Sequence, residues 1–140
     1  MRSTTDVAVV GAGPCGLAAA IAMRDAGLGA IVFDAGCVVS SVAGYPTYMT
    51  FFSTAEKLAI GGLPFVVANE KPTRRDALAY YRAVVQHFAL TVRQYERVLS
   101  VAPAGDGFLL CSRTRAVEEH ATEARAVVIA TGYFGTPNRL

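Results

Sequence analysis

The sequence predicts an α/β fold: one Rossmann-like domain with a parallel central sheet, flanking helices and a small antiparallel meander. Two observations predict the parallel part. A glycine-rich turn at residues 11–16 joins an apolar run, residues 7–10, to an alanine-rich helical stretch at residues 17–26. Two further apolar runs, residues 30–33 and 126–130, are continuous rather than alternating, which is typical of parallel strands buried on both faces.

The turn at residues 11–16 has the spacing of a dinucleotide-binding turn, with Gly11, Gly13 and Gly16 at the required positions. The first glycine permits the tight turn, the second lets the backbone approach a pyrophosphate, and the third lets the helix pack on the strand. The helix that follows offers unpaired N–H groups and the positive end of its dipole to an anion. Small residues also occur wherever a helix packs closely on a sheet, so the glycines alone leave that alternative open. In this strand–turn–helix context we predict a bound dinucleotide.

Asp34 ends the second apolar run, 18 residues after Gly16. An acid at about this offset accepts hydrogen bonds from the ribose hydroxyls of a dinucleotide. A 2′-phosphate would meet the carboxylate as a like charge, so the site suits FAD or NAD better than NADP. The alternative is that Asp34 only caps a turn before Gly36.

The middle of the chain reads as a loop, one helix and short strands. Residues 38–54 have no clean period and predict an ordered loop. A capping box at residues 73–76 precedes an amphipathic helix over residues 74–88. We expect the antiparallel meander from three segments of strand composition, residues 90–93, 97–101 and 108–112, the last two separated by turn residues at 103–107.

Composition limits the classes of function. The 140 residues suffice for one domain with its own core, and two full nucleotide domains would not fit. The net charge of +2 and the scattered arginines give no case for a nucleic-acid partner. The glycine turn interrupts the only signal-like segment, and no run approaches the roughly 18 apolar residues of a membrane span, so we expect a cytoplasmic protein away from membranes. Three unclustered cysteines and two isolated histidines predict neither a disulfide framework nor a metal site.

Several stretches together resemble the N-terminal FAD part of flavoprotein reductases related to thioredoxin reductases. Within that superfamily the chain is most similar to the YpdA family of NADPH-dependent bacillithiol disulfide reductases. The resemblance rests on residues 11–17, 45–47, 50–53, 57–61, 80–82 and 130–135, which read GAGPCGL, YPT, TFFS, KLAIG, YYR and ATGYFG.

The resemblance implies that FAD is the cofactor, with its diphosphate over the glycine turn, its adenosine ribose on Asp34, its adenine against backbone near Val98, and its ring near Thr50 and Phe51. The residues expected to bind it are Gly11, Gly13, Pro14, Cys15, Gly16, Asp34, Ala35, Gly36, Thr50, Phe51, Val98, Ala130, Thr131 and Gly132. Phe51 has a strong competing interpretation, because neighbouring aromatics in an apolar chain are more often part of the core.

Relatives in this family continue into an NADPH domain and then return to the FAD domain with a final strand and helix. The resemblance therefore implies that residues 1–140 are the N-terminal fragment of such a protein and that the NADPH site lies outside them. On that interpretation the longer protein reduces a low-molecular-weight thiol disulfide, and this chain alone shows little or no NADPH-dependent turnover. Apolar surface left uncovered in such a fragment also suggests self-association into a homo-oligomer.

Cys15 is the candidate redox thiol that the resemblance nominates. The helix dipole favours a thiolate there, whereas a bound diphosphate would bring negative charge beside the sulfur. The alternative is a small packing residue beneath the cofactor.

Two other functions also stay open: a flavin monooxygenase, because the turn at residues 130–133 followed by Pro137 resembles those enzymes, and a non-catalytic FAD-binding module.

Overall fold

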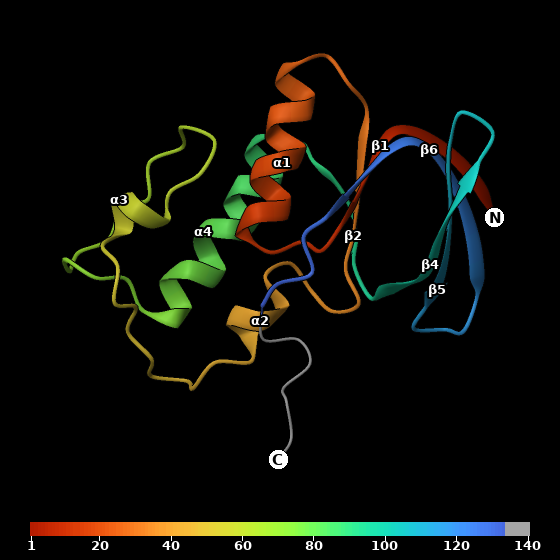
Figure 1. The fold of residues 1–140 in the computed structure, drawn as a ribbon. Helices are drawn as coiled ribbons and strands as arrows, with labels where there is room; N and C mark the ends of the chain where they lie inside the picture. Colours follow the sequence, from red (N-terminus) through yellow and green to blue (C-terminus); the bar gives the residue numbers. More distant parts are fainter. Residues whose placement is uncertain (134–140) are drawn as a thin grey trace.

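A computed structural model describes residues 1–133, which form one mixed sheet with helices on one side (Figure 1). The sheet has six strands in the order β3-β2-β1-β6-β5-β4. The strands are β1 (Arg2–Val10), β2 (Ala30–Phe33), β3 (Thr91–Arg93), β4 (Glu96–Ala104), β5 (Gly107–Thr114) and β6 (Glu119–Ile129). The helices are α1 (Pro14–Asp25), α2 (Ser40–Ala43), α3 (Ala55–Leu58) and α4 (Arg74–His87).

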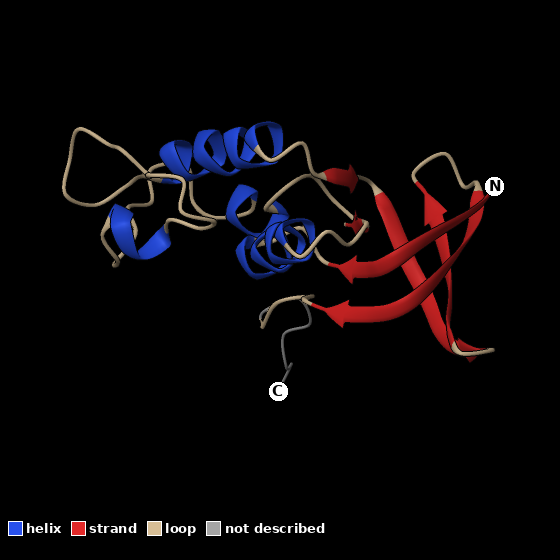
Figure 2. Cartoon of the chain, turned by 90° about the horizontal axis from the view of Figure 1, so that it is seen from above, coloured by secondary structure: helices blue, strands red, loops and turns tan. Residues whose placement is uncertain are grey.

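The pairing of β6 joins a parallel half of the sheet to an antiparallel half. β1 pairs in parallel with both β2 and β6, and β3 pairs in parallel with β2. β5 pairs antiparallel with β4 and with the first half of β6. The meander therefore continues the central sheet, and the strongly twisted strands curl away from the helices (Figure 2).

Two predictions about the middle of the chain were wrong in part. Residues 90–93 were expected in the meander, but β3 lies at the opposite edge of the sheet, beside β2. Strand composition indicates that a segment is extended and says nothing of its partner. Residues 38–54 include the short helix α2, whose four residues are too few to show a helical period, and α3 follows at Ala55–Leu58.

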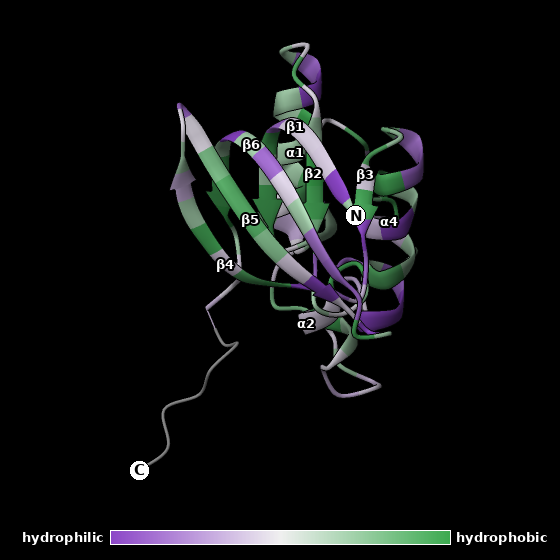
Figure 3. Cartoon of the chain, turned by 90° about the vertical axis from the view of Figure 1, so that its right-hand side faces the viewer, coloured by the Kyte–Doolittle hydropathy of each residue, from purple (hydrophilic) through white to green (hydrophobic). Residues whose placement is uncertain are grey.

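Both faces of β1 and β2 are buried near their carboxyl ends, as their continuous apolar runs predict. The same prediction for the run at residues 126–130 was wrong, because in β6 Val127 and Val128 are only half-buried and Ile129 is 64% exposed. Val7 and Val9 of β1 pack in the core on the helix side, with residues of α1 and α4. Ala8 points to the other face and packs with Phe33 and with Leu110 of β5, where the curled sheet covers itself. In Figure 3 the strand ends beside α1 and α4 are coloured as hydrophobic. This arrangement holds the carboxyl end of β1 rigidly, and the glycine turn follows it.

The predicted capping box at the start of α4 is present. The Thr73 hydroxyl accepts a hydrogen bond from the Asp76 N–H at 3.2 Å, and the Asp76 carboxylate accepts one from the Thr73 N–H at 2.8 Å. The Thr73 hydroxyl also donates to that carboxylate at 2.7 Å. The hydrogen bonds from the Thr73 side chain and backbone hold the pKa of Asp76 below its usual value.

This box predicts an acid-sensitive contribution to stability. Because the pKa of Asp76 is lower in the folded chain, its stabilisation is fully present above the unfolded value of 3.8 and is lost as the pH falls through the folded value. We expect Asp76→Ala to lower the free energy of unfolding by about 1 kcal/mol at neutral pH, and the difference from wild type to shrink below about pH 4. Urea unfolding at both pH values measures it. Asp106→Ala, at an exposed turn position, is the control, and a deficit that does not vary with pH would contradict the prediction.

None of the helices within residues 1–133 is long and apolar enough to cross a membrane.

Candidate functional site

The glycine turn lies where the carboxyl ends of β1 and β6 meet the start of α1 (Figure 1). The Ala130 N–H donates to the Val10 carbonyl at 2.8 Å, which brings the end of β6 against the turn. Gly11 has a φ of +113°, and a Cβ placed on it would collide with the Ala130 carbonyl. A Cβ on Gly16 would collide with the Gly11 carbonyl. These two glycines therefore permit close backbone packing, as predicted for the first and third positions.

Gly13 differs from the other two glycines of the turn. It has extended backbone, with φ −75° and ψ 177°, and a Cβ on it would meet nothing within 4 Å. The fold itself therefore does not require glycine at this position. The open space in front of Gly13 is what close approach of a pyrophosphate would need.

The start of α1 presents unpaired donors beside that space. The first bond of the helix runs from the Leu17 N–H to the Gly13 carbonyl at 2.9 Å, so among residues 1–133 the N–H groups of Cys15 and Gly16 find no acceptor. Pro14 opens the helix, where its missing N–H costs nothing. No acidic side chain lies in the first turn and no side chain caps it. Such a helix end favours a bound anion.

Asp34 follows β2 and connects the turn to the next loop. One carboxylate oxygen accepts from the Ala12 N–H at 2.8 Å. The other accepts from the Gly36 N–H at 2.8 Å and from the Ser40 hydroxyl at 3.0 Å. A carboxylate has about four acceptor positions, so one remains for a ligand hydroxyl. Asp34 thus does cap the turn at Gly36, and this role does not exhaust its acceptors.

The loop after Asp34 is also fixed from the side of β3 and β4. The Asp34 N–H donates to the Arg93 carbonyl, and the Glu96 N–H donates to the Asp34 carbonyl at 2.9 Å. The Gly36 carbonyl accepts from the Tyr95 N–H at 2.9 Å. Val98 lies two residues beyond Glu96 on β4, so backbone near Val98 is close to the loop that carries Asp34. Ala35, between the two bonded residues, is exposed.

Cys15 is exposed in the first turn of α1, directly beside the unpaired N–H groups. Burial, with smaller contributions from Tyr80 and Cys15, raises the pKa of Tyr81 to about 12. The Tyr81 hydroxyl donates to the Leu58 carbonyl at 2.9 Å. Tyr81 therefore stays protonated at neutral pH and does not act as a base toward the thiol. Cys37 is half-buried after Gly36, and Cys111 is exposed on β5, away from the turn.

The two residues expected near a flavin ring differ in their environment: Thr50 is exposed, whereas Phe51 packs against the core. Thr50 is exposed and forms an isolated bridge with Thr73. Phe51 packs against the core on the helix side, and its ring centroid lies 6.1 Å from that of Tyr45. The competing core interpretation of Phe51 thus has support, while Phe52 is 93% exposed.

The end of β6 supplies a second exposed turn near the first. Ala130 contacts Gly11 as described, and Thr131 and Gly132 follow as exposed residues, with a φ of +84° at Gly132. Residues 134 and 135 of the ATGYFG stretch, and Pro137, lie outside the described residues.

Two residues that sequence reasoning missed belong to this site. Val39 donates its N–H to the Ala12 carbonyl at 2.9 Å, and Ser40 donates to Asp34. Neither carries a local signal, because both lie in the stretch of residues 38–54 that has no period. Their contacts depend on residues that are distant along the chain.

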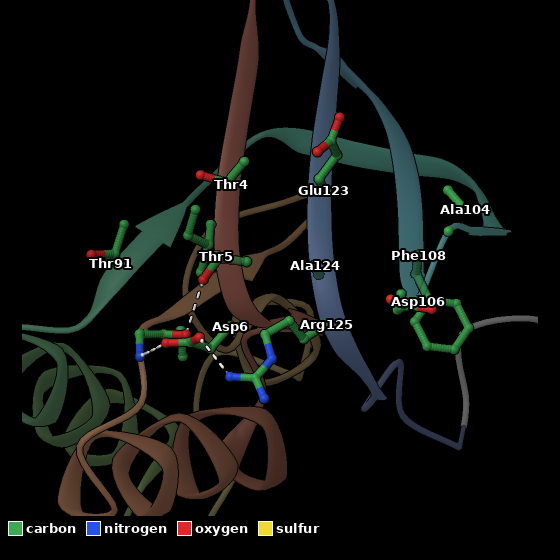
Figure 4. A pocket seen from close by; sticks show the side chains of 15 residues that line it. Thr4, Thr5, Asp6, Thr91, Ala104, Asp106, Phe108, Glu123, Ala124 and Arg125 are labelled. Carbon is green, nitrogen blue, oxygen red and sulfur yellow. Dashed lines mark hydrogen bonds and ion pairs between the residues drawn. The ribbon is translucent and has the colours of Figure 1, made fainter.

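A separate hollow of about 1250 Å³ lies beside the first half of β1 and the turn between β4 and β5 (Figure 4). Several of its polar groups are already bonded to other groups of the protein. Asp6 accepts from the Gly29 N–H at 2.8 Å and lies 3.4 Å from the Arg125 guanidinium, and the Thr5 hydroxyl donates to the Gly29 carbonyl. The glycine turn follows the opposite end of β1. This hollow is therefore distinct from the candidate site.

A buried polar cluster joins β4, β5 and β6 on another part of the sheet. The Ser112 hydroxyl donates to the buried Glu96 carboxylate at 2.6 Å, and His120 Nδ1 lies 3.1 Å from the same oxygen. Its groups come from three different strands. Within the described part of the chain no three side chains of metal-binding type lie together.

The comparisons agree with this geometry. Residues 8–140 match the family described as Pyridine nucleotide-disulphide oxidoreductase. The chain is 41% identical over 130 residues to Bacilliredoxin reductase Bdr of Bacillus subtilis (strain 168), covering 93% of this chain and 39% of that protein. The solved Bacillithiol Disulfide Reductase Bdr (YpdA) from Bacillus cereus superimposes with a TM-score of 0.96 and 41% identity, covering 98% of this chain and 42% of that one.

A second type of flavoenzyme has the same fold. A Flavin-containing monooxygenase from Stenotrophomonas maltophilia superimposes with a TM-score of 0.79 and 30% identity, covering 97% of this chain and 42% of that one. These likenesses confirm the predicted fold class. The chain spans about two fifths of the length of the relatives it matches.

Proposed function

Because this chain belongs to the Pyridine nucleotide-disulphide oxidoreductase family, we propose that it is the FAD-binding part of a flavoprotein disulfide reductase. The observation that carries the proposal is the turn at residues 11–16, where unpaired N–H groups of α1 border the open space at Gly13. This arrangement suits the diphosphate of a dinucleotide. The residues that would hold the cofactor are those of this turn, Asp34 and the exposed turn at residues 130–132.

FAD is favoured over a phosphorylated nicotinamide nucleotide at this turn. The Asp34 carboxylate keeps one acceptor position for a ribose hydroxyl, and its negative charge repels a 2′-phosphate. We place NADPH at a second nucleotide domain of a longer protein, consistent with the chain's span of 39% of the Bacillus subtilis relative. On this proposal residues 1–140 are the first part of the FAD domain. We also propose that the protein is located in the cytoplasm.

The proposed substrate is a low-molecular-weight thiol disulfide of the bacillithiol type. The 41% identity to a protein named for bacillithiol disulfide reduction supports it over the monooxygenase alternative, for which identity is 30%. When bound, the flavin would carry two electrons from NADPH to the disulfide, releasing two thiols. The chain's own residues bind and orient the cofactor.

Cys15 is the proposed redox thiol. Its side chain is exposed at the start of α1, where a disulfide substrate can reach it. It lies in the first turn of α1, beside the unpaired N–H groups of that helix end. Cys37 and Cys111 lack this helix-end environment.

A direct test is titration of the purified chain with FAD, followed by flavin absorption and fluorescence. We expect a saturable change with FAD that ADP reverses by competition, because ADP carries the same adenosine and diphosphate. FMN, which lacks both the diphosphate linkage and the adenosine, is the matched control and should bind far more weakly. Absence of any saturable FAD signal, or equal affinity for FMN, would contradict the proposal.

A further inference from the structure

The peptide group of Ala12, at the centre of the glycine turn, is held from both sides by one neighbouring loop. Its N–H donates to Asp34 at 2.8 Å, and its carbonyl accepts from the Val39 N–H at 2.9 Å. Ala12 itself is fully buried. The orientation of the turn therefore depends on the loop that runs from Asp34 to Ser40.

Val39 adopts an unusual backbone conformation to make this contact. Its φ is +49° and its ψ is 47°, the left-handed region, which a β-branched residue rarely occupies. Its side chain is 1% exposed, so the surrounding core holds it in place. Strain of this kind persists where the surrounding structure overdetermines it, commonly at ligand sites. Here it directs one N–H at Ala12 and places Ser40 at the start of α2.

Ser40 is the side chain that completes the hydrogen bonding of Asp34 among residues 1–133. Its hydroxyl donates to Oδ1 at 3.0 Å, whereas the other two donors, Gly36 and Ala12, are backbone N–H groups. A Cβ on Gly36 would lie 2.8 Å from the Ser40 Cβ, so the absence of a side chain at Gly36 makes room for Ser40. The carboxylate is thereby fixed in one orientation.

We propose that Ser40 is a positioning residue for the adenosine half of the cofactor, acting through Asp34. This rests on the proposed function. By holding the carboxylate in place before the ligand arrives, Ser40 leaves the remaining acceptor position directed at one ribose hydroxyl. Preorganisation of this kind increases affinity because less ordering is left to binding. The effect is confined to ligands that carry the ribose, because Ser40 donates to Asp34 Oδ1, whereas the turn itself is held by Asp34 Oδ2 and the Val39 N–H.

The test measures the affinity of wild type and of three variants for each of three ligands. The ligands are FAD, ADP and inorganic pyrophosphate. Ser40→Ala should weaken FAD and ADP about tenfold, as expected for a hydrogen bond to a charged group, and leave pyrophosphate unchanged. Ser40→Thr, which keeps the hydroxyl, should restore most of the affinity. Ser41→Ala, at the exposed neighbour on the same helix, is the matched control and should bind all three ligands like wild type.

The outcomes separate the proposals. Equal FAD affinity in Ser40→Ala and wild type would overturn the positioning role. A loss of pyrophosphate affinity as large as the loss of FAD affinity would also overturn it, because it would show that Ser40 only maintains the turn. If Ser40→Ala does not fold, Ser40→Cys keeps the volume with a weak donor and should show the same selective loss for FAD and ADP. A wild-type chain that binds pyrophosphate and neither FAD nor ADP would refute the proposed function, and the role of Ser40 with it.

Discussion

Replacing Gly13 with alanine is expected to leave the fold intact and to weaken FAD binding at least about tenfold, because the second glycine of the turn is where backbone approaches the diphosphate. The backbone at Gly13 suits any residue, and a Cβ there would meet nothing within 4 Å. We therefore expect the free energy of unfolding to stay within about 0.5 kcal/mol of wild type. Urea unfolding and FAD titration of the same preparation measure the two quantities.

Gly16→Ala is the matched comparison at the same turn. Its Cβ would collide with the Gly11 carbonyl, which is backbone and cannot move aside without displacing β1 or α1. We expect a loss of about 3 kcal/mol in unfolding free energy, at the upper end of overpacking effects, together with the loss of FAD binding. If Gly13→Ala bound FAD like wild type, the diphosphate would not lie over this turn.

Replacing Cys15 with alanine should lower disulfide reduction at least about a hundredfold in a protein that carries both nucleotide domains. In the proposed step the Cys15 thiol would form a mixed disulfide and release one thiol, and the two electrons that the flavin supplies would then release the second and restore Cys15. Cys15 is exposed, so the substitution should cost little stability. FAD binding should be retained, which separates a redox role from damage to the turn. Steady-state reduction of bacillithiol disulfide by NADPH measures the effect.

Two other cysteines provide controls for that experiment. Cys37 is half-buried and Cys111 is exposed on β5, and alanine at either position should keep turnover near that of wild type. Normal turnover in the Cys15→Ala variant would remove the redox assignment and favour the packing role.

Much of the site was predictable because its signals are local. The glycine spacing at residues 11–16, the acid at Asp34 and the capping box at residues 73–76 each depend on residues that are close along the chain. Local backbone conformation and hydrogen bonding follow from such short patterns. The structure places Asp34 beside the turn through Ala12, and it brings Ala130 against Gly11.

The predictions that failed or were missed involve partners that are distant along the chain. Residues 90–93 read as a strand, but only the assembled sheet shows β3 beside β2. Phe51 packs against the helix-side core but is only partly buried, and its contact with a flavin stays a prediction. His120 and Ser112 converge on Glu96 because three strands come together. A strand or side chain of suitable composition is compatible with many partners, and packing selects among them.

By itself, then, the sequence determined a strand–glycine turn–helix unit with an acid at the right offset, because glycine conformation and apolar periodicity act over a few residues. Only the tertiary structure decided how the site is held: the left-handed Val39 and the hydroxyl of Ser40 meet Ala12 and Asp34 after β1, β2 and α2 have packed together. These contacts arise from the buried core around them, which no short stretch of residues specifies.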